Sequence, residues 1–325
     1  ARFGFEMTRL TLRSLQLIFL ACVDTQAFAQ GSSKSLQKPP EGFQPIFDGM
    51  TLEGWHGRPH FNTVKLAEMP EAERQAKLDE WMADAKQHWT VDAGELVNDG
   101  HGAFLVTNDD YTDFELMLEY KTVPKADSGI YLKGSPQVQI WDYTYPNEFR
   151  NGSDRGSGGL WNNSAGAPGK YPFVLADNPI GQWNQFYIRQ VGARTTVYLN
   201  DILIVDHAVM ENFWDRDSPL FASGPIELQT HGGEIRWRNI WLKELSPEEA
   251  NQRLREHEGQ AFASLFNGVD LTGWQGSVEN YEVVDGASRC KQGQGGMLLT
   301  EKEYGNFIAR VEFRLPPGGN NGLAI

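Results

Sequence analysis

The chain repeats part of its own sequence, and this repeat limits the possible folds more than any other feature. Residues 43–57, F-Q-P-I-F-D-G-M-T-L-E-G-W-H-G, return 219 positions later as residues 262–276, F-A-S-L-F-N-G-V-D-L-T-G-W-Q-G. Five further positions recur at a displacement of 193: Leu105, Thr107, Tyr111, Phe114 and Gly129 return as Leu298, Thr300, Tyr304, Phe307 and Gly322. Such self-similarity is the signature of a duplicated structural unit. We therefore expect one domain followed by the start of its copy.

The two displacements differ by 26 residues, which predicts an insert in the first copy between Gly57 and Leu105. Within it, residues 70–86 begin with proline and acidic residues, as helices often do, and the apolar residues that follow recur at helical spacing. These apolar residues are Leu78, Trp81, Met82 and Ala85. We expect a short helix that docks on the domain. The predicted domain is 30–246, the charged linker 247–261, and the truncated second copy 262–325.

The rest of the first copy reads as a series of short strands, in which apolar and polar residues alternate with a period of two. The predicted strands are 113–121, 129–133, 137–141, 183–189, 195–199 and 202–205. Asn200-Asp201 joins the last two as a tight turn, because both residue types tolerate a left-handed backbone. Many strands and few helices predict an all-β fold, a two-sheet antiparallel β-sandwich.

Residues 225–242, P-I-E-L-Q-T-H-G-G-E-I-R-W-R-N-I-W-L, read as a hairpin closed at Gly232-Gly233. In its first strand Glu227, Gln229 and His231 alternate with apolar residues and would share one face. That face could carry chemistry. It could equally be the solvated side of a half-buried strand.

The N-terminal segment and the net charge indicate the cellular location that we expect and the partners that we do not expect. A basic segment at 7–13, an apolar stretch at 17–23 and Ala27-Phe28-Ala29 resemble a secretory signal peptide, residues 1–29, too short to span a membrane. Lipid attachment at Cys22 is the alternative. We expect a periplasmic or secreted protein without a membrane span. After cleavage only Cys290 remains, so no intrachain disulfide can form. The formal net charge of −14, without a basic cluster, argues against nucleic acid as a partner.

Several kinds of chemistry find no support in the sequence. There is no E-x-D-x-x-E run of the sort that sandwich-fold glucanases carry, and no serine elbow between a strand and a helix. His56 and His60 lie in H-G-R-P-H, where glycine and proline oppose the helix that would aim both at one metal ion. We expect no cofactor, although calcium on loop carboxylates such as Asp154 or Asp177 stays open.

A second candidate strand, Gln137–Asp142, offers partners for the polar face. Gln139 could share that face with Gln229, and Asp142 stands where a long Gly-rich loop begins, a place where sites are often built. Several aromatic residues offer flat faces for a sugar ring, although packing in the core or a loop is an alternative for each: Trp141, Tyr143, Tyr145, Trp161 and Trp214.

These segments together resemble the 3-keto-disaccharide hydrolase family. The resemblance covers residues 42–245 and, truncated, 262–325, and it rests on several motifs in order. They are D-S-G-I-Y-L-K-G at 127–134, Q-I-W-D at 139–142, G-L-W-N at 159–162, W-N at 183–184, Asn200, L-Q-T-H-G-G at 228–233 and R-N-I at 238–240. Two departures are Asp201 in place of the usual glycine and Lys133 where arginine is frequent. The resemblance implies a concanavalin A-like jelly roll.

The resemblance also implies hydrolysis of 3-keto-glycosides outside the cytoplasm, on sugars that a partner sugar 3-dehydrogenase has oxidised. A 3-keto group acidifies the hydrogen on C2, so that a base can form an enolate and the group on C1 leaves by elimination before water adds. Such a site needs a base, an acid and a donor for the enolate oxygen. We expect His231 or Asp142 as base, Glu227 or the other of that pair as acid, and Lys133 or Arg236 as donor.

In this scheme Gln139 and Gln229 would hold ring hydroxyls of the sugar. Two other functions compete with it: a non-catalytic carbohydrate-binding module of the lectin or laminin-G kind, and an extracellular adhesion domain. Turnover separates them, because a binding module retains sugar without forming product.

Overall fold

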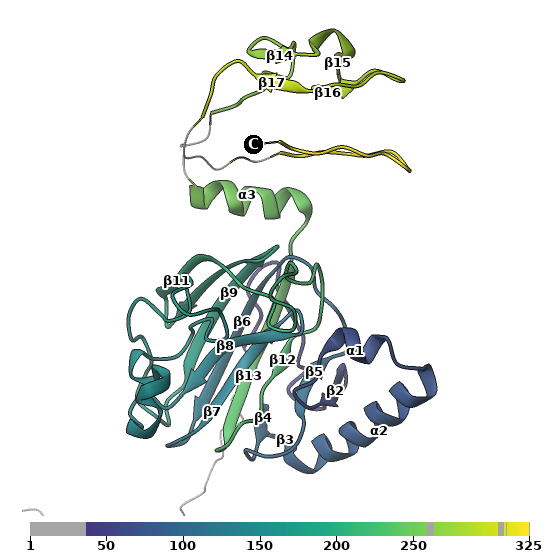
Figure 1. Cartoon of the computed structure of the whole chain (residues 1–325). Helices are drawn as coiled ribbons and strands as arrows, with labels where there is room; N and C mark the ends of the chain where they lie inside the picture. The colour runs from purple at the N-terminus through teal and green to yellow at the C-terminus, as the bar shows by residue number, and fades with distance from the viewer. Residues whose placement is uncertain (1–36, 259–262, 305–308, 310, 325) are drawn as a thin grey trace, which may run out of the picture. The chain divides into compact units, whose positions relative to one another are not determined.

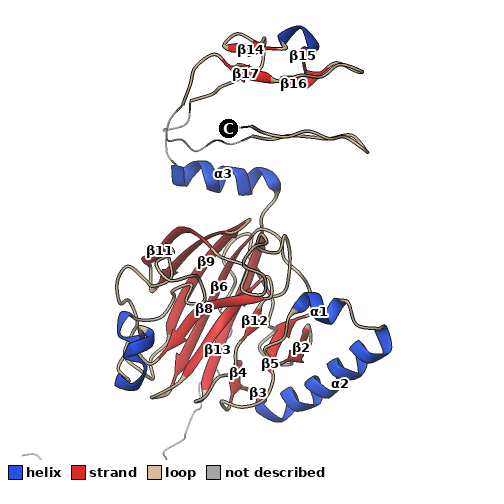
Figure 2. Ribbon diagram, viewed as in Figure 1, coloured by secondary structure: helices blue, strands red, loops and turns tan. Residues whose placement is uncertain are grey.

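The computed structural model describes residues 37–258, 263–304, 309 and 311–324. The predicted signal peptide therefore lies outside the described residues. The chain divides into two compact units, with the boundary between Leu245 and Ser246. The first unit is built from two antiparallel sheets, with its helices at the periphery (Figures 1 and 2). The predicted all-β, two-sheet antiparallel sandwich is confirmed.

The larger sheet has eight strands in the order β11-β10-β9-β6-β13-β4-β3, with β1 paired to β13. Its strands are β1 (Gln44–Pro45), β3 (Trp89–Asp92), β4 (Glu95–Asn98), β6 (Phe114–Thr122), β9 (Asn184–Val191), β10 (Arg194–Leu199), β11 (Ile202–Val209) and β13 (Ile235–Glu244). The smaller sheet has five strands in the order β2-β5-β12-β7-β8. They are β2 (Trp55–Arg58), β5 (Phe104–Thr107), β7 (Asp127–Leu132), β8 (Ser135–Trp141) and β12 (Glu227–Leu228).

The core fills the space between the sheets. Alternate residues of the smaller sheet, among them Leu105, Ile130 and Leu228, join a single buried cluster with Leu116 and Phe186 of the larger sheet. Because side chains alternate along a strand, the other face of the smaller sheet points away from this core. We call that second face the outer face.

The predicted hairpin at 225–242 was wrong. β12 and β13 belong to different sheets, so Gly232-Gly233 carries the chain from one sheet to the other. Two other chain segments crowd this crossing. A Cβ atom on Gly233 would lie 2.9 Å from the Cα of Ala126, and one on Gly100 would lie 2.7 Å from the backbone nitrogen of Gly233. Glycine is needed here for close approach of backbones, whereas the Asn200-Asp201 turn, with φ of 52° and 64°, does close the hairpin of β10 and β11.

The insert of the first copy forms two helices, α1 (Thr63–Ala67) and α2 (Glu71–His88), beside β2 and β5 (Figure 1). Trp81 and Met82 of α2 pack against the core, and Ala85 is buried within it. A Cβ atom on Gly57 of β2 would collide with the backbone of Trp81, so the helix lies directly on that strand. The predicted helix and its apolar stripe are thus present.

The second unit holds α3 (Pro247–Glu258) and two short strand pairs, β14 (Trp274–Gly276) with β17 (Leu298–Thr300), and β15 (Tyr281–Val284) with β16 (Ala287–Cys290). Trp274 pairs with Thr300 in β14–β17, as Trp55 pairs with Thr107 in β2–β5. The indole of Trp274 donates to the carbonyl of Leu265, as that of Trp55 donates to Ile46, 219 residues earlier.

Candidate functional site

The outer face of the smaller sheet gathers polar side chains from three neighbouring strands. Glu227 of β12 pairs with Tyr131 of β7, and along β7 Gly129 pairs with Gln139 of β8. Asp127 pairs in turn with Trp141. Because alternate residues share a face, Glu227, Gln229 and His231 lie on the same side as Tyr131 and Asp127. The predicted alternation is therefore present, but both sides of this segment are covered up to Thr230, and only His231 is exposed.

His231 forms an ion pair with Asp127 at one end of this face. The distance from His231 Nδ1 to Asp127 Oδ2 is 3.0 Å, and the side chains are 62% and 25% exposed. The hydrogen bond with Asp127 raises the pKa of His231, and the charge of Glu148 adds to this, while burial acts in the opposite direction. The other carboxylate oxygen of Asp127 accepts a hydrogen bond from Gln139 Nε2 at 2.7 Å, which fixes its orientation.

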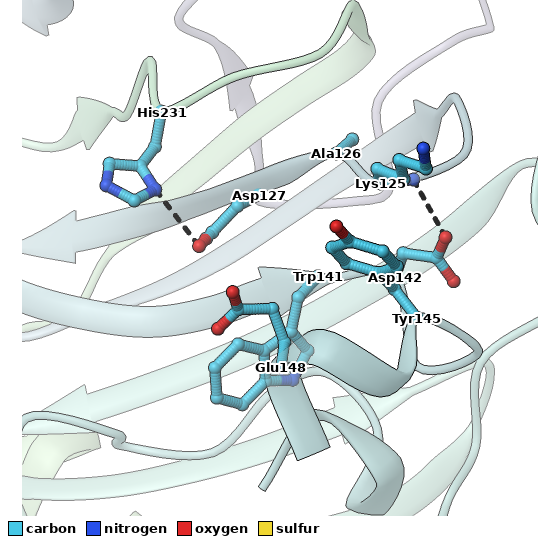
Figure 3. Close-up of a pocket in the computed structure, with 8 residues that line it drawn as sticks. All are labelled: Lys125, Ala126, Asp127, Trp141, Asp142, Tyr145, Glu148 and His231. Atoms are coloured by element: carbon cyan, nitrogen blue, oxygen red, sulfur yellow. Dashed lines mark hydrogen bonds and ion pairs between the residues drawn. The ribbon is translucent and has the colours of Figure 1, made fainter. Parts of the chain in front are cut away.

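These residues line an open pocket of about 170 Å³. Its walls also include Lys125, Trp141, Tyr145 and Glu148. In Figure 3, His231, Asp127 and Glu148 gather at one end, and Lys125 and Tyr145 stand at the other. Glu148 comes from the short helix η1 (Pro146–Asn151), so the pocket joins strands of the sheet to the long Gly-rich loop. The volume lies below the range usual for pockets that bind drug-sized ligands.

Asp142 also lines the pocket, but its oxygens are occupied. One accepts from the backbone N–H of Lys125 at 2.8 Å, and the other accepts from the N–H and hydroxyl of Thr144 at 2.8 and 2.6 Å. Although burial alone would raise the pKa of Asp142, these hydrogen bonds lower it. Asp142 therefore holds the start of the loop as a carboxylate and is poorly placed to move a proton.

Glu227, the third predicted catalytic residue, is enclosed farther along the outer face. Its Oε1 lies 2.5 Å from Arg58 Nη2, and the two side chains are only 1% and 4% exposed. Burial raises the pKa of Glu227, and the charge of Arg58 opposes this. The buried pair supports this part of the sheet and does not open into the His231 pocket.

Two predicted enolate donors lie away from the pocket. Lys133 Nζ donates to the carbonyl of Gly192 at 3.0 Å and lies 3.9 Å from Asp113, with its side chain 1% exposed. Arg236 of β13 belongs to the larger sheet, where it pairs with Glu234, Asp92 and Glu95. The positive charges of Lys133 and Arg236 suggested that these residues stabilise the enolate. In the structure, contacts with carboxylates or a carbonyl outside the pocket occupy both side chains.

Of the side chains predicted to hold the sugar ring, Trp141 and Tyr145 line the pocket. Gln139 and Gln229 are 2% and 7% exposed. Gln139 and Gln229 both lie on the outer face, and Gln229 Oε1 would stand 3.0 Å from a Cβ atom placed on Gly129 between them. Trp141 forms a wall of the pocket, and Trp161 packs edge-on against it with ring centroids 6.0 Å apart. Trp161 is therefore a neighbour of the pocket wall rather than a lining residue.

The opposite end of the outer face carries a second histidine, which the sequence considered only as a metal ligand. His60 Nδ1 lies 2.6 Å from the hydroxyl of Tyr131. The imidazole of His60 is exposed and contacts the rings of Phe213 and Trp214, with centroids 5.4 and 4.7 Å away. Burial and the charge of His231 both lower the pKa of His60.

Sequence reasoning missed Asp127, Glu148 and His60. Asp127 has the same alternation as Gly129 and Tyr131, so an earlier start of the predicted strand at 129 would have included it. Glu148 lies in a loop without periodicity and gave no signal. Among the described residues, no group of three or more His, Cys, Asp or Glu could hold a metal ion, and no helix is long and apolar enough to cross a membrane.

Comparison with known proteins gives one family. The 3-keto-alpha-glucoside-1,2-lyase-like domain matches residues 42–243 and, a second time, residues 261–325. No curated protein sequence matches the chain.

Three solved structures are similar in part. A protein of Parabacteroides distasonis ATCC 8503, provisionally assigned as a glycosyl hydrolase, is 19% identical, with 63% of this chain and 95% of that chain covered and a TM-score of 0.43. A second protein from the same organism with the same provisional assignment is 22% identical, with 49% and 91% covered and a TM-score of 0.39. A carbohydrate-binding module of Bacillus subtilis is 10% identical, with 48% and 91% covered and a TM-score of 0.32.

Proposed function

Because the chain belongs to the family of 3-keto-alpha-glucoside-1,2-lyase-like domains, which is a carbohydrate-active family, we propose that its first unit cleaves the glycosidic bond of 3-keto-glycosides in the His231 pocket. The observation that carries the proposal is the convergence of the His231–Asp127 pair and Glu148 at one end of the open pocket.

The reaction needs one group that accepts a proton and one that donates it. The base takes the hydrogen from C2 next to the keto group, and the electron pair forms an enolate. The bond from C1 to the leaving oxygen then breaks, a C1–C2 double bond forms, and the leaving oxygen takes a proton from the acid. Addition of water across the double bond completes the hydrolysis. No pair of glycosidase carboxylates is required, which agrees with the lack of an E-x-D-x-x-E run in the sequence.

We propose these roles for residues other than those the sequence suggested. Asp142 and Glu227 are held by loop and buried contacts, so we propose His231 and Glu148 for proton transfer; one oxygen of Glu148, Oε2, accepts a hydrogen bond from Asn151 at 2.5 Å. Since Asp127 raises the pKa of His231, its imidazolium persists closer to neutral pH and suits the acid. Glu148 then acts as the base. Lys125 and Tyr145, at the other end of the pocket, offer donors for the enolate oxygen.

The cellular setting of this reaction is part of the same proposal. Its substrate must come from an enzyme that oxidises a sugar at C3, so we propose a sugar 3-dehydrogenase as functional partner. The sequence at residues 7–29 motivates a periplasmic or secreted location.

The test is release of the leaving group from a 3-keto-glucoside and from its unoxidised parent by the purified full chain. We expect release from the keto sugar alone, with uptake of solvent deuterium at C2. His231→Gln and Glu148→Gln should each lower kcat at least about 100-fold, since acid–base groups typically contribute that much. His88→Gln is the matched control, because His88 makes the same kind of 3.0 Å pair with Asp99 outside the pocket.

No release by the wild-type chain would end the proposal. Retention of the keto sugar without release would indicate the carbohydrate-binding alternative. Equal losses in His231→Gln and in the His88→Gln control would show that the pocket does not carry the reaction.

A further inference from the structure

The end of the outer face opposite to His231 has the features of a second binding subsite. His60 is exposed, and Phe213 and Trp214 beside it are half-buried rather than enclosed. The ring of Trp214 lies 4.7 Å from that of His60 at an interplanar angle of 38°, and Phe213 meets His60 edge-on at 5.4 Å. Partly exposed aromatic rings that flank a polar group match a sugar ring, which has apolar C–H faces and a rim of hydroxyls.

The contact with Tyr131 orients the imidazole of His60. Burial and the charges of Glu227 and Asp127 raise the pKa of Tyr131, whose side chain is fully enclosed, so its phenol keeps its proton. Tyr131 Oη and His60 Nδ1 lie 2.6 Å apart, and when the phenol donates this hydrogen bond the imidazole hydrogen stands on Nε2. Burial and the charge of His231 lower the pKa of His60, which favours the neutral ring. In this tautomer Nε2–H is suited to a hydroxyl or ether oxygen of a ligand.

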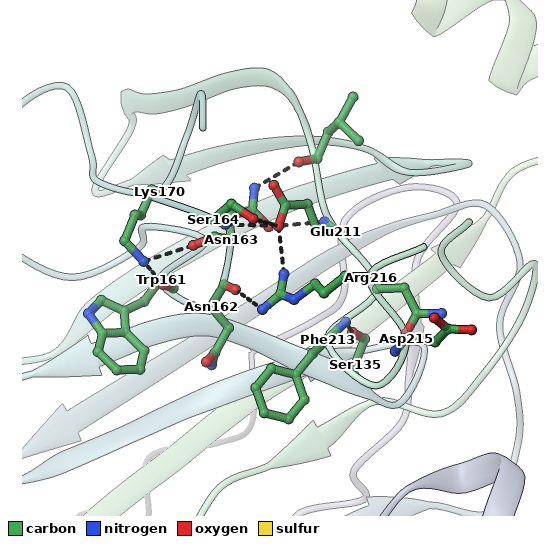
Figure 4. A network of polar contacts seen from close by, with 12 residues as sticks. Ser135, Trp161, Asn162, Asn163, Ser164, Lys170, Glu211, Phe213, Asp215 and Arg216 are labelled. Carbon is green, nitrogen blue, oxygen red and sulfur yellow. Dashed lines mark hydrogen bonds and ion pairs between the residues drawn. The ribbon is translucent and has the colours of Figure 1, made fainter. Parts of the chain in front are cut away.

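The loop that carries Phe213 and Trp214 is fixed before any ligand binds. The indole of Trp214 donates to the carbonyl of Gly134 at 2.8 Å, and the N–H of Phe213 donates to Ser135 Oγ at 3.3 Å. Arg216 ties the loop to the neighbouring one, through Glu211 at 2.6 Å and the carbonyl of Asn162 at 2.5 Å (Figure 4). Pre-organised side chains lose little freedom on binding, which favours affinity.

Strand β7 runs from this end to the His231 pocket, where its first residue, Asp127, lines the wall. Tyr131, Gly129 and Asp127 follow one another on the outer face of β7, and four residues of strand span about 13 Å. Midway, Gly129 contributes no side chain. There Gln229 Oε1 lies buried with no hydrogen-bond partner among the described residues, and the residue is only 7% exposed. A buried acceptor without a partner is costly, and a ligand hydroxyl would satisfy it.

We propose that His60, Phe213 and Trp214 form the subsite for the leaving group of the glycoside, a second sugar ring, which stacks on Trp214 and accepts a hydrogen bond from His60 Nε2. The inference rests on the proposed function and adds to it. The keto sugar occupies the His231 pocket, the leaving ring reaches toward His60, and Gln229 accepts a hydroxyl between them. His60 binds the leaving group and takes no part in proton transfer.

The test compares two substrates that share the 3-keto-glucosyl group. One carries a second glucose as leaving group and the other a methoxy group, and the measured quantity is the ratio of their kcat/KM values. We expect Trp214→Ala to lower this ratio about tenfold and His60→Ala to lower it about fivefold, through KM for the disaccharide. His60→Gln, which keeps an amide donor near the position of Nε2, should recover part of the loss.

Trp183→Ala is the matched control, since Trp183 lies against Lys121 and Arg238 of the larger sheet, and it should leave the ratio unchanged. An unchanged ratio in Trp214→Ala and in His60→Ala would overturn the subsite, and so would equal losses on both substrates. His60 is exposed, so its variant should fold even if Trp214→Ala does not. Absence of turnover by the wild-type chain would instead remove the proposed function, and the subsite with it.

Discussion

The two histidines of the outer face are each contacted through Nδ1, and their pKa values are shifted in opposite directions. Nδ1 of His231 faces the carboxylate of Asp127 at 3.0 Å, and Nδ1 of His60 faces the phenol of Tyr131 at 2.6 Å. The pKa of His231 is raised and that of His60 is lowered. The hydrogen bond with Asp127 sets the direction for His231, whereas burial and the charge of His231 set it for His60.

The environments of the two partners, Asp127 and Tyr131, also differ. Asp127 is a quarter exposed and keeps its charge in contact with solvent. Tyr131 is enclosed beside the buried Glu227, whose charge disfavours a phenolate. In the proposed function, the Asp127 end of the face serves proton transfer and the Tyr131 end serves recognition.

Loss of the charge of Glu227 should have the largest effect, because it would leave Arg58 buried without a counter-charge. We expect Glu227→Gln to lower the free energy of unfolding by about 3 kcal/mol, as broken buried pairs do. Chemical denaturation measures this. The combination of Arg58→Met with Glu227→Leu should restore most of it. A double variant no more stable than Glu227→Gln would show that the pair does more than balance charge.

Asp127→Asn keeps a side chain of the same size and removes the charge that His231 feels. We expect kcat toward the 3-keto-glucoside to fall about 100-fold. The pKa of His231 should fall toward its ordinary value, so the decline of kcat/KM with rising pH should begin at lower pH. A pH–rate profile of both proteins measures this. A decline at the same pH in both would assign it to another group.

Tyr131→Phe removes the donor that fixes His60 and leaves the ring in place. A phenol that donates to Nδ1 stabilises the neutral ring, so its loss should raise the pKa of His60 and leave that of His231 almost unchanged. NMR titration of the two imidazole Cε1 protons follows both groups in one sample. Equal changes in the pKa values of His60 and His231 would mean that the two ends of the outer face are not electrostatically independent.

The smallest effect concerns stability between about pH 5 and pH 8. The raised pKa of His231 stabilises the fold fully below the pKa of the unfolded chain, and this is lost as pH rises through the folded pKa. The lowered pKa of His60 acts with the opposite sign, because the unfolded chain binds the proton first as pH falls. Urea midpoints should therefore change with pH in opposite directions in His231→Gln and His60→Gln, each relative to wild type.

The sequence predicted the frame of the fold because alternation and turn chemistry are local. The strands around Leu116 and Ile188 and the Asn200-Asp201 turn follow from their own residues. The role of Gly232-Gly233 could not be predicted in this way, because two consecutive glycines occur both in hairpin turns and where two backbones approach closely.

Local alternation also accounts for part of the candidate site. The alternation of residues along 227–231 and 137–141 places His231, Gln229 and Gln139 on the outer face. Long-range partners decide which charges are free, and Lys133 was misjudged because its partners Asp113 and Gly192 are distant in sequence. Glu148 depends on the path of a loop, for which the sequence offers no periodic signal.

The repeated strand in the second unit bears on the history of the chain. Its pairing register and its indole hydrogen bond match those of the first copy. Arg58 and His60 follow in the stretch between Gly57 and Leu105 where the displacement changes from 219 to 193, so the similarity of the copies is interrupted where these outer-face residues begin. Selection can thus act on the scaffold and on the chemistry separately, so a gene duplication of this kind leaves one domain free to acquire a new ligand while it keeps its shape.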